Sequence, residues 1–185
     1  QLNPMSYLEG VELMNHHCVQ HMPNWILTEE RRKLLCEIVS RLDFIPLAID
    51  IAGGRLADIS LIDLYKRLTV QEFGTEGSTL YKAIEWSVSG LEEQYKEMLF
   101  SLSVFPQYTS LEMIDFVVGT DSASPFEALE ALARNQLLKR KIVGRELRYS
   151  LLSSVREYAK TQLPSEKMNE LITRLSTFCF ENIEQ

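Results

Sequence analysis

The sequence predicts a mainly α-helical protein: a small helical bundle followed by a winged-helix domain with a short β-hairpin, and then the start of a further helical segment. Along most of the chain, apolar residues recur at spacings of three and four, as they do on the buried face of amphipathic helices. This period changes in residues 137–151, where two apolar-rich runs flank a glycine-containing turn. Several helices followed by one hairpin is the element order of a winged helix, a relative of the helix-turn-helix.

Residues 1–72 are predicted to form the helical domain. A first helix is expected where apolar residues recur from Tyr7 to Met14, and His21–Trp25 is expected to interrupt it because this stretch contains a proline. Thr28 is expected to cap a second helix, since acidic residues follow it in the first turn. The buried face of this second helix is predicted to consist of Leu34, Leu35, Ile38, Val39 and Leu42.

Pro46 is expected to start a third helix, because its fixed φ and missing N–H suit the first helical position. Gly53 and Gly54 in this helix would let a neighbouring backbone approach closely. A fourth helix is predicted from Asp58 to Leu68, with Ser60 as its cap.

Residues 73–78 are predicted to be a linker, since this glycine-containing stretch has no apolar period. Residues 79–164 are expected to form the winged-helix domain, and residues 165–185 a C-terminal helix that leads to a further domain. Helices are predicted at Leu80–Val88, Leu91–Val104, Leu111–Val118, Pro125–Asn135 and Ser153–Leu163, with hairpin strands at Leu137–Val143 and Leu147–Leu151 around the turn Gly144–Glu146.

The composition is that of an ordinary globular protein, with 45% apolar and 24% charged residues. A formal net charge of −7 argues against a protein that coats nucleic acid or anionic lipid with its entire surface. No apolar run approaches the roughly 20 residues that span a bilayer, and the start lacks the features of a signal peptide. The expected location is cytoplasmic, with no membrane partner. Because the chain begins with Gln1, it is expected to be a fragment of a longer protein.

Motifs for catalysis and metal binding are absent from the sequence. It has neither a Gly-x-x-x-x-Gly-Lys-[Ser/Thr] phosphate-binding loop nor a Gly-x-Ser-x-Gly turn. No catalytic residue is therefore predicted, and the chain alone is not expected to hydrolyse ATP. His17 and His21 are one helical turn apart, but no cysteine or carboxylate at a matching spacing completes a metal site, so none is predicted.

Three segments resemble STAND-class ATPases, the NB-ARC-like or AP-ATPase group. The segment RLDFIPLAIDIAGGRL, residues 41–56, resembles the family signature rLdGLPLAIeLAaaRL. The segment RYSLLSSVREYA, residues 148–159, resembles RYRLLETVREYA, and residues 80–105 are similar to the stretch that lies between these two signatures in the family. The chain therefore looks like the helical and winged-helix part of the family's nucleotide-binding module.

The resemblance implies a contact with the nucleotide in the first signature. In the family, the proline of a Gly-x-Pro motif packs against the adenine end of the nucleotide, which assigns this role to Pro46, with Ile45 and Phe44 beside it. Phe44 stands where the family has glycine. Either the backbone does not need the conformational freedom of glycine here, or the nucleotide fits differently.

The second signature lies where many relatives carry a Met-His-Asp sensor, whose histidine touches the β-phosphate of ADP. Leu151, Leu152 and Ser153 occupy these positions here. Ser153 therefore marks the sensor position without its chemistry, and the two leucines are expected to be core residues at the end of a strand.

The resemblance implies a regulatory segment that senses nucleotide and relays a conformational change in signalling or transcriptional regulation. ADP or ATP, with Mg, is expected only in the full-length protein, where an upstream P-loop domain of the same chain would be the partner, and the isolated fragment is expected to hold no cofactor. Self-association on activation is a further expectation. A protein-interaction scaffold remains an alternative reading.

A winged-helix module that binds nucleic acid is the other alternative. Its evidence is a cluster of cations on the predicted hairpin: Lys139, Arg140, Lys141, Arg145 and Arg148. Such a wing could follow phosphates. The helix expected to enter a DNA groove, however, carries Glu127 and Glu130 against Arg134, so nucleic acid is the less favoured partner.

Overall fold

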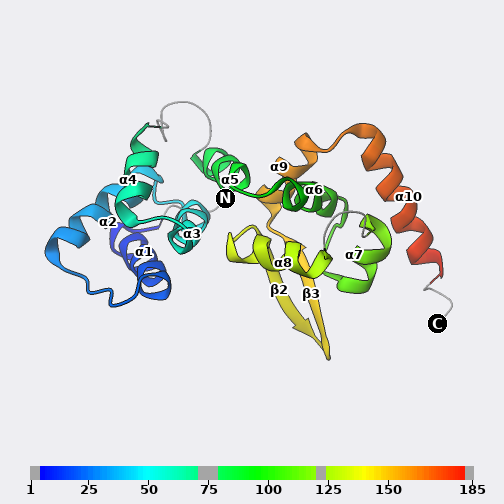
Figure 1. Cartoon of the computed structure of the whole chain (residues 1–185), viewed down its shortest axis with the longest axis horizontal. Coiled ribbons are helices and arrows are strands. Elements are labelled where there is room, and N and C mark those ends of the chain that lie inside the picture. The colour runs from blue at the N-terminus through cyan, green and yellow to red at the C-terminus, as the bar shows by residue number, and fades with distance from the viewer. Residues whose placement is uncertain (1–4, 71–78, 120–123, 182–185) are drawn as a thin grey trace. The chain divides into compact units, whose positions relative to one another are not determined.

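The computed structural model describes residues 5–70, 79–119 and 124–181. The chain divides into two compact units, residues 1–89 and 90–185 (Figure 1). Each unit is described by itself. Within the described residues, no helix is long and apolar enough to cross a membrane.

The first unit is built from helices. They are α1 (Tyr7–His21), α2 (Glu29–Arg41), α3 (Pro46–Gly54), the 3-10 turn η1 (Arg55–Ala57), α4 (Leu61–Val70) and α5 (Thr79–Ser89). Helix α1 packs against α2 and α3, and α3 also packs against α5. The core comes from the apolar faces of these helices, including Met14 of α1, Ile38 of α2 and Ile49 of α3, which are fully buried.

The predicted helix starts in this unit are largely confirmed. The Thr28 hydroxyl accepts a hydrogen bond from the Arg31 amide, and Pro46 occupies the first turn of α3. The Ser60 hydroxyl accepts from the Asp63 amide at 3.1 Å, as a cap should. The prediction that this fourth helix begins at Asp58 is wrong, because the Asp58 amide closes the preceding turn on the Arg55 carbonyl.

Helix α5 belongs to the first unit, although the sequence analysis assigned it to the winged-helix domain. Its apolar face, with Ala83 and Ile84 buried, packs against α3. The Thr79 hydroxyl also donates a hydrogen bond to the Asp43 carboxylate in the turn before α3. The compact units therefore divide after Ser89. The predicted linker, residues 73–78, lies outside the described residues.

A close approach was predicted at Gly53, and the structure shows that the neighbour is a side chain. The imidazole of His17 on α1 packs directly over Gly53 on α3, so that an added Cβ would lie 2.9 Å from the His17 Cβ and closer still to the ring. His17 is buried, and its Nε2 is hydrogen-bonded to the Asp50 carboxylate at 3.0 Å. Because Gly53 of α3 has no side chain, the buried His17 of α1 fits between the two helices.

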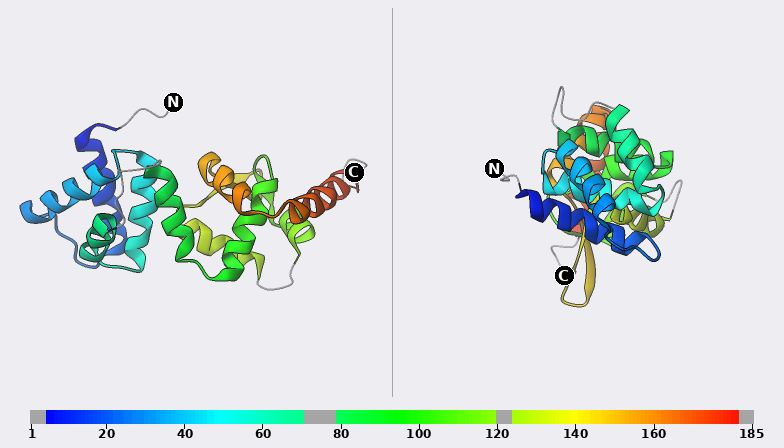
Figure 2. Two further views of the ribbon diagram at one scale, coloured as in Figure 1. Left: turned by 90° about the horizontal axis from the view of Figure 1, so that it is seen from above. Right: turned by 90° about the vertical axis from the view of Figure 1, so that its left-hand side faces the viewer.

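The second unit is a winged helix, which confirms the predicted fold class. Its elements are α6 (Glu93–Ser101), the 3-10 turn η2 (Leu102–Val104), β1 (Thr109–Ser110), α7 (Leu111–Val118), α8 (Pro125–Arg134), β2 (Leu138–Val143), β3 (Glu146–Leu151), α9 (Ser153–Gln162) and α10 (Ser165–Glu181). The three strands form an antiparallel sheet in the order β1-β3-β2. The β2–β3 hairpin extends away from the helices of this unit (Figure 2).

The sheet differs from the prediction in two details. Strand β1 was not predicted, because two residues are too few to show a period; its Thr109 lies opposite Tyr149 of β3. The hairpin turn is tighter than expected, since Val143 pairs directly with Glu146 and leaves only two residues between the strands. Gly144, with φ of 65°, supplies the left-handed conformation that this turn requires.

Helix α10 packs against the winged helix. Its Leu171 and Phe178 are buried, and the Phe178 ring lies 5.2 Å from that of Phe116 on α7. The segment predicted as a separate C-terminal helix is therefore part of the compact second unit over its described residues.

The contact between His17 and Gly53 gives a test of the helix packing. Gly53→Ala is expected to destabilise the protein by about 1–3 kcal/mol, because the new methyl group overlaps the imidazole. Urea unfolding followed by circular dichroism measures this change. The double variant Gly53→Ala/His17→Ala should lose much less stability than the sum of the two single variants, and strict additivity would contradict the overlap.

Candidate functional site

The N-terminus of α3 is the first candidate site. Ile45 is the N-cap residue and makes no side-chain capping bond, and Pro46 follows it at the first helical position. The Ile49 amide makes the first bond of the helical ladder, to the Ile45 carbonyl, so the Leu47 and Ala48 amides lie outside this ladder. This end of α3 combines a rigid apolar ring with backbone donors, which suits a flat ligand that has polar edges.

The turn before Pro46 has a left-handed backbone. Phe44 has φ of 55° and Asp43 has φ of 50°, so both lie in the left-handed region that glycine adopts most readily. Phe44 thus adopts, without being glycine, a conformation that glycine takes up most readily. Such a conformation costs roughly 1–2 kcal/mol for a residue with a Cβ.

Neighbouring contacts hold Phe44 in this conformation. Its amide donates to the Val39 carbonyl at 3.3 Å, and its carbonyl accepts from the Met5 amide at 3.0 Å. Its ring lies 6.1 Å from the ring of Tyr7, in a tilted arrangement. Both sides of the turn are thus tied to other parts of the first unit, which fixes the direction in which Pro46 enters α3.

The sensor position lies in the second unit, whereas Pro46 lies in the first. Ser153 is exposed at the start of α9. Leu151 is buried at the end of β3, as expected, but Leu152 is only half-buried and serves as the N-cap residue of α9.

Arg156, which was not predicted as a site residue, organises the β3–α9 junction. Its guanidinium donates to the Ser150 hydroxyl at 3.1 Å and to the Leu151 carbonyl at 3.2 Å. The polar groups beside the sensor position are therefore used to hold α9 against the sheet. Arg156 lies in the segment VREYA, residues 155–159, which resembles the family signature, and this position could have marked it as a structural residue.

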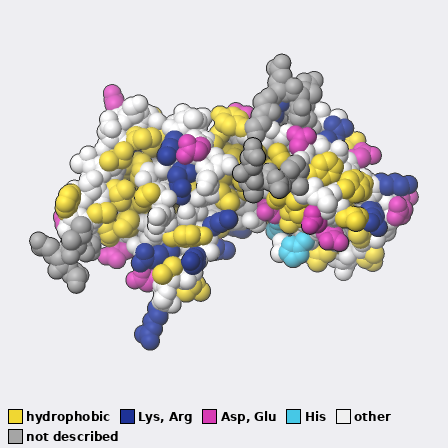
Figure 3. All heavy atoms as spheres, turned by 180° about the vertical axis from the view of Figure 1, so that it is seen from behind, with side chains coloured by type: hydrophobic (Ala, Val, Ile, Leu, Met, Phe, Trp, Pro, Cys, Tyr) yellow, Lys and Arg dark blue, Asp and Glu magenta, His cyan; other side chains and the backbone are white. Residues whose placement is uncertain are grey.

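The basic hairpin is the second candidate site. Figure 3 shows Lys and Arg side chains gathered on the protruding hairpin. Lys141 and Arg148 are directly opposite each other in the register, and Lys139 lies two residues before Lys141. Because side chains alternate along a strand, these three cations share one face. Within the described residues, the only ion pair on this face is that of Arg148 with Glu146, at 3.3 Å.

Arg140 points to the other face and is held by α8. It forms an ion pair with Glu130 of α8 and lies opposite Tyr149 of β3. Burial first, and then the Glu130 carboxylate, raise the pKa of the Tyr149 phenol. Arg140 therefore links the hairpin to α8 through an ion pair. Lys139, Lys141 and Arg148 lie on the opposite face of the hairpin.

Two further contacts complete the hairpin. The Lys141 ammonium lies 5.8 Å from the centre of the Tyr108 ring, a cation–π distance. Tyr108 precedes β1 and had no sequence signal for this role. Arg145 occupies the two-residue turn, and within the described residues it has no ion-pair partner. The arrangement offers several exposed positive charges to an extended anion.

Helix α8 presents a different surface. Its Ala128, Leu129, Ala131 and Leu132 are buried, and its outward residues include Phe126, exposed over 51% of its surface, and the exposed Glu127. Its exposed residues also include one cation, Arg134, so this helix offers no excess of positive charge, whereas the hairpin is basic.

The fold and this site define a winged-helix protein with a basic wing. No family model matches the chain. Curated relatives include one protein of Mycobacterium bovis and two of Mycobacterium tuberculosis, each named "Putative HTH-type transcriptional regulator". Each is 28% identical over 168 residues, which cover 84% of this chain and 19% of the relative. The chain thus spans about a fifth of the length of these regulators.

The left-handed turn gives a test at Phe44. Phe44→Val is expected to be less stable than Phe44→Asn by about 1 kcal/mol, because a β-branched residue tolerates positive φ far worse than asparagine does. Urea unfolding measures the difference. At Phe126, which lies in helix α8, the same two substitutions should differ little. A valine variant at 44 at least as stable as the asparagine variant would show that φ is not positive there.

Proposed function

We propose that this chain is part of a transcription regulator and that its winged-helix unit contacts the phosphate backbone of DNA through the β2–β3 hairpin. The observation that carries the proposal is the cross-strand pair of Lys141 and Arg148. Like charges directly opposite each other weaken a strand pair. A phosphate between them would turn this repulsion into attraction, and Lys139 on the same face extends the cationic surface along the hairpin.

The same geometry argues for backbone contact and against base reading by α8. On the exposed surface of α8 the negative charge of Glu127 is offset by the positive charge of Arg134, and Glu130 is already paired with Arg140. This helix therefore offers DNA no net positive charge. Phosphate contacts position a protein on DNA but carry no sequence information. The proposed contact is therefore salt-dependent and only weakly selective, so selection of a particular DNA sequence would have to come from elsewhere in a longer regulator.

The names of the relatives support the regulatory part of this proposal. These names refer to proteins about five times as long as the matched segment, and they do not say which part contains the helix-turn-helix. The hairpin of this chain is the described surface that best fits such a role, because its positive charges lie together in a protein whose net charge is −7.

Loss of hairpin cations tests the DNA contact. Lys141→Ala and Arg148→Ala should each weaken binding to a fluorescent duplex and should each reduce the salt slope of log K by about 0.9, the value for one lost phosphate contact. Fluorescence anisotropy titrations between about 50 and 200 mM salt measure both quantities.

The matched control is Lys160→Ala, which removes an exposed lysine of α9 outside the hairpin. It should leave affinity and slope close to those of the unchanged protein. If the hairpin variants behave like this control, or if the unchanged protein binds no duplex at low salt, the hairpin does not contact DNA.

The N-terminus of α3 favours a second function, a nucleotide-dependent relay of the kind implied by the resemblance to STAND-class ATPases. Pro46 would lie against the adenine of ADP or ATP held, with Mg, by an upstream P-loop domain. The left-handed turn at Phe44 supports this reading because it keeps the backbone path for which the family uses glycine. ATP hydrolysis would belong to the upstream domain, and this chain would be non-catalytic.

A hydrogen bond connects this turn to helix α5. Asp43, next to Phe44, accepts a hydrogen bond from Thr79, the first residue of α5. A nucleotide that shifted the turn would therefore also change a contact of α5, the last helix of the first unit. The available energy is the difference in nucleotide affinity between the two arrangements.

Pro46→Ala in the full-length protein tests this relay. The affinity for ADP should fall by about tenfold, since alanine removes much of the apolar surface offered to the base and a tenfold change corresponds to about 1.4 kcal/mol. Isothermal titration calorimetry measures the affinity. Pro106→Ala, at an exposed proline outside the helices, is the control and should change nothing. Equal affinities for ADP in the two variants would show that Pro46 does not contact the nucleotide.

A further inference from the structure

A cavity lies within the second unit, apart from both candidate sites. Its volume is about 550 Å³, and it opens between α6, the C-terminal end of α7 and the α9–α10 junction. Its apolar lining includes Met98 of α6, Val118 of α7, and Leu163 and Pro164 of the junction. Cavities of roughly 300–1,000 Å³ that are mainly apolar, with a few polar groups, are the usual sites for small molecules.

One cation and one helix start lie on the same side of this cavity. Lys167 lines it from the first turn of α10. The first ladder bond of α10 runs from the Met168 amide to the Pro164 carbonyl, so the amides of residues 165–167 lie outside the ladder. Proline at the preceding position has no side-chain oxygen with which to cap them. The uncapped start of α10 and Lys167 thus both contribute positive potential at this opening, which the exposed Glu166 of the same turn offsets in part.

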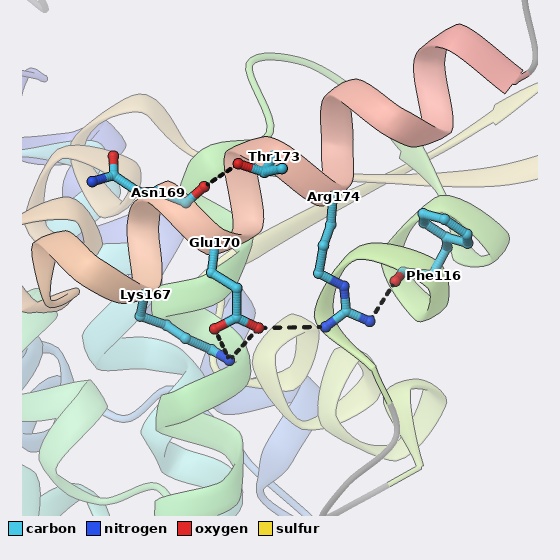
Figure 4. Close-up of polar contacts among 6 residues, drawn as sticks. All are labelled: Phe116, Lys167, Asn169, Glu170, Thr173 and Arg174. Atoms are coloured by element: carbon cyan, nitrogen blue, oxygen red, sulfur yellow. Dashed lines mark hydrogen bonds and ion pairs between the residues drawn. The ribbon is translucent and has the colours of Figure 1, made fainter.

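The Lys167 ammonium can change partners at little cost to the structure. It contacts both oxygens of Glu170, at 3.0 and 3.2 Å, in an exposed pair on the same helix (Figure 4). Glu170 is also paired with Arg174 at 3.7 Å, and Arg174 donates to the Phe116 carbonyl at 2.8 Å. Glu170 therefore keeps one cation if Lys167 turns to a ligand, and α10 stays anchored to the end of α7.

Glu97 of α6 is the opposing charge in the lining. It disfavours ligands with several negative charges, because a carboxylate next to the cavity repels each of them. An apolar body with a single acidic group matches the lining best: the body fills the space between α6 and the junction, and the acid takes the place of Glu170 at Lys167.

We propose that this cavity binds a small organic molecule with an apolar body and one acidic group. Such a ligand would contact α6 and α10 together and would fix the start of α10 against the winged helix. This site is independent of the DNA contact and of the nucleotide relay, because it shares no residue with either.

Two fluorescent probes test the proposal. One is 1-anilinonaphthalene-8-sulfonate, which has an apolar body and one acidic group, and the other is N-phenyl-1-naphthylamine, which has the same rings without the acid. Both are titrated into the unchanged protein, into Lys167→Met and Gln94→Trp, and into the control Lys160→Met. Gln94 lines the cavity, so tryptophan there should fill its opening, whereas Lys160 does not line it. Thermal unfolding checks that each variant is folded.

The expected result is saturable binding of one sulfonate probe per chain. Lys167→Met should lower the affinity for the sulfonate probe about tenfold and leave the affinity for the neutral probe unchanged. Gln94→Trp should lower the affinity for both probes, and Lys160→Met should lower neither. Glu97→Gln should raise the affinity for the sulfonate probe. Amide shifts in NMR spectra should centre on residues 97–101, 118–119 and 163–167. The absence of saturable binding, equal effects of Lys167→Met on both probes, or shifts centred elsewhere would each overturn the proposal.

Discussion

The pairing of β3 with strands on both of its sides is the interaction on which the second unit depends. Tyr149 lies in the middle of β3, only 2% exposed, between Thr109 of β1 and Arg140 of β2. This arrangement joins the segment before α7 to the hairpin after α8 and so closes the winged helix. It also fixes which face each hairpin cation occupies. A slip of one residue would move Lys141 to the side of α8 and Arg140 to the outside.

The strand register decides which face of the hairpin each cation occupies. Five cations in one short segment suggest a single basic surface, but the sheet divides four of them between two faces and leaves Arg145 in the turn. Arg140 is used inside the unit, where it neutralises Glu130 of α8. Lys139, Lys141 and Arg148 share the outward face. The same pairing thus stabilises the hairpin on one side and leaves an unfavourable like-charge pair on the other, which is the arrangement expected where an anion contributes to the final state.

The first unit depends on a comparable constraint at the start of α3. Two consecutive residues with positive φ, neither of them glycine, are costly unless their surroundings hold them. Here the amide and carbonyl of Phe44 are both hydrogen-bonded, and the Asp43 carboxylate accepts from Thr79 of α5. The turn therefore links the chain before α1, the end of α2 and the start of α5. A ligand at Pro46 would act on a turn that several elements already share.

The sequence by itself determined most of the helices, two of their caps and the hairpin, because these features depend on local chemistry: apolar spacing, Thr28 and Ser60 as caps, Pro46 at a helix start, and Gly144 in the turn. It also located the basic hairpin. Only the tertiary structure decided that α5 packs with the first unit, that Phe44 takes up a glycine-like φ, that Gly53 makes room for His17, and that Arg140 faces α8. These outcomes depend on which distant segments meet, and a local pattern does not contain that information.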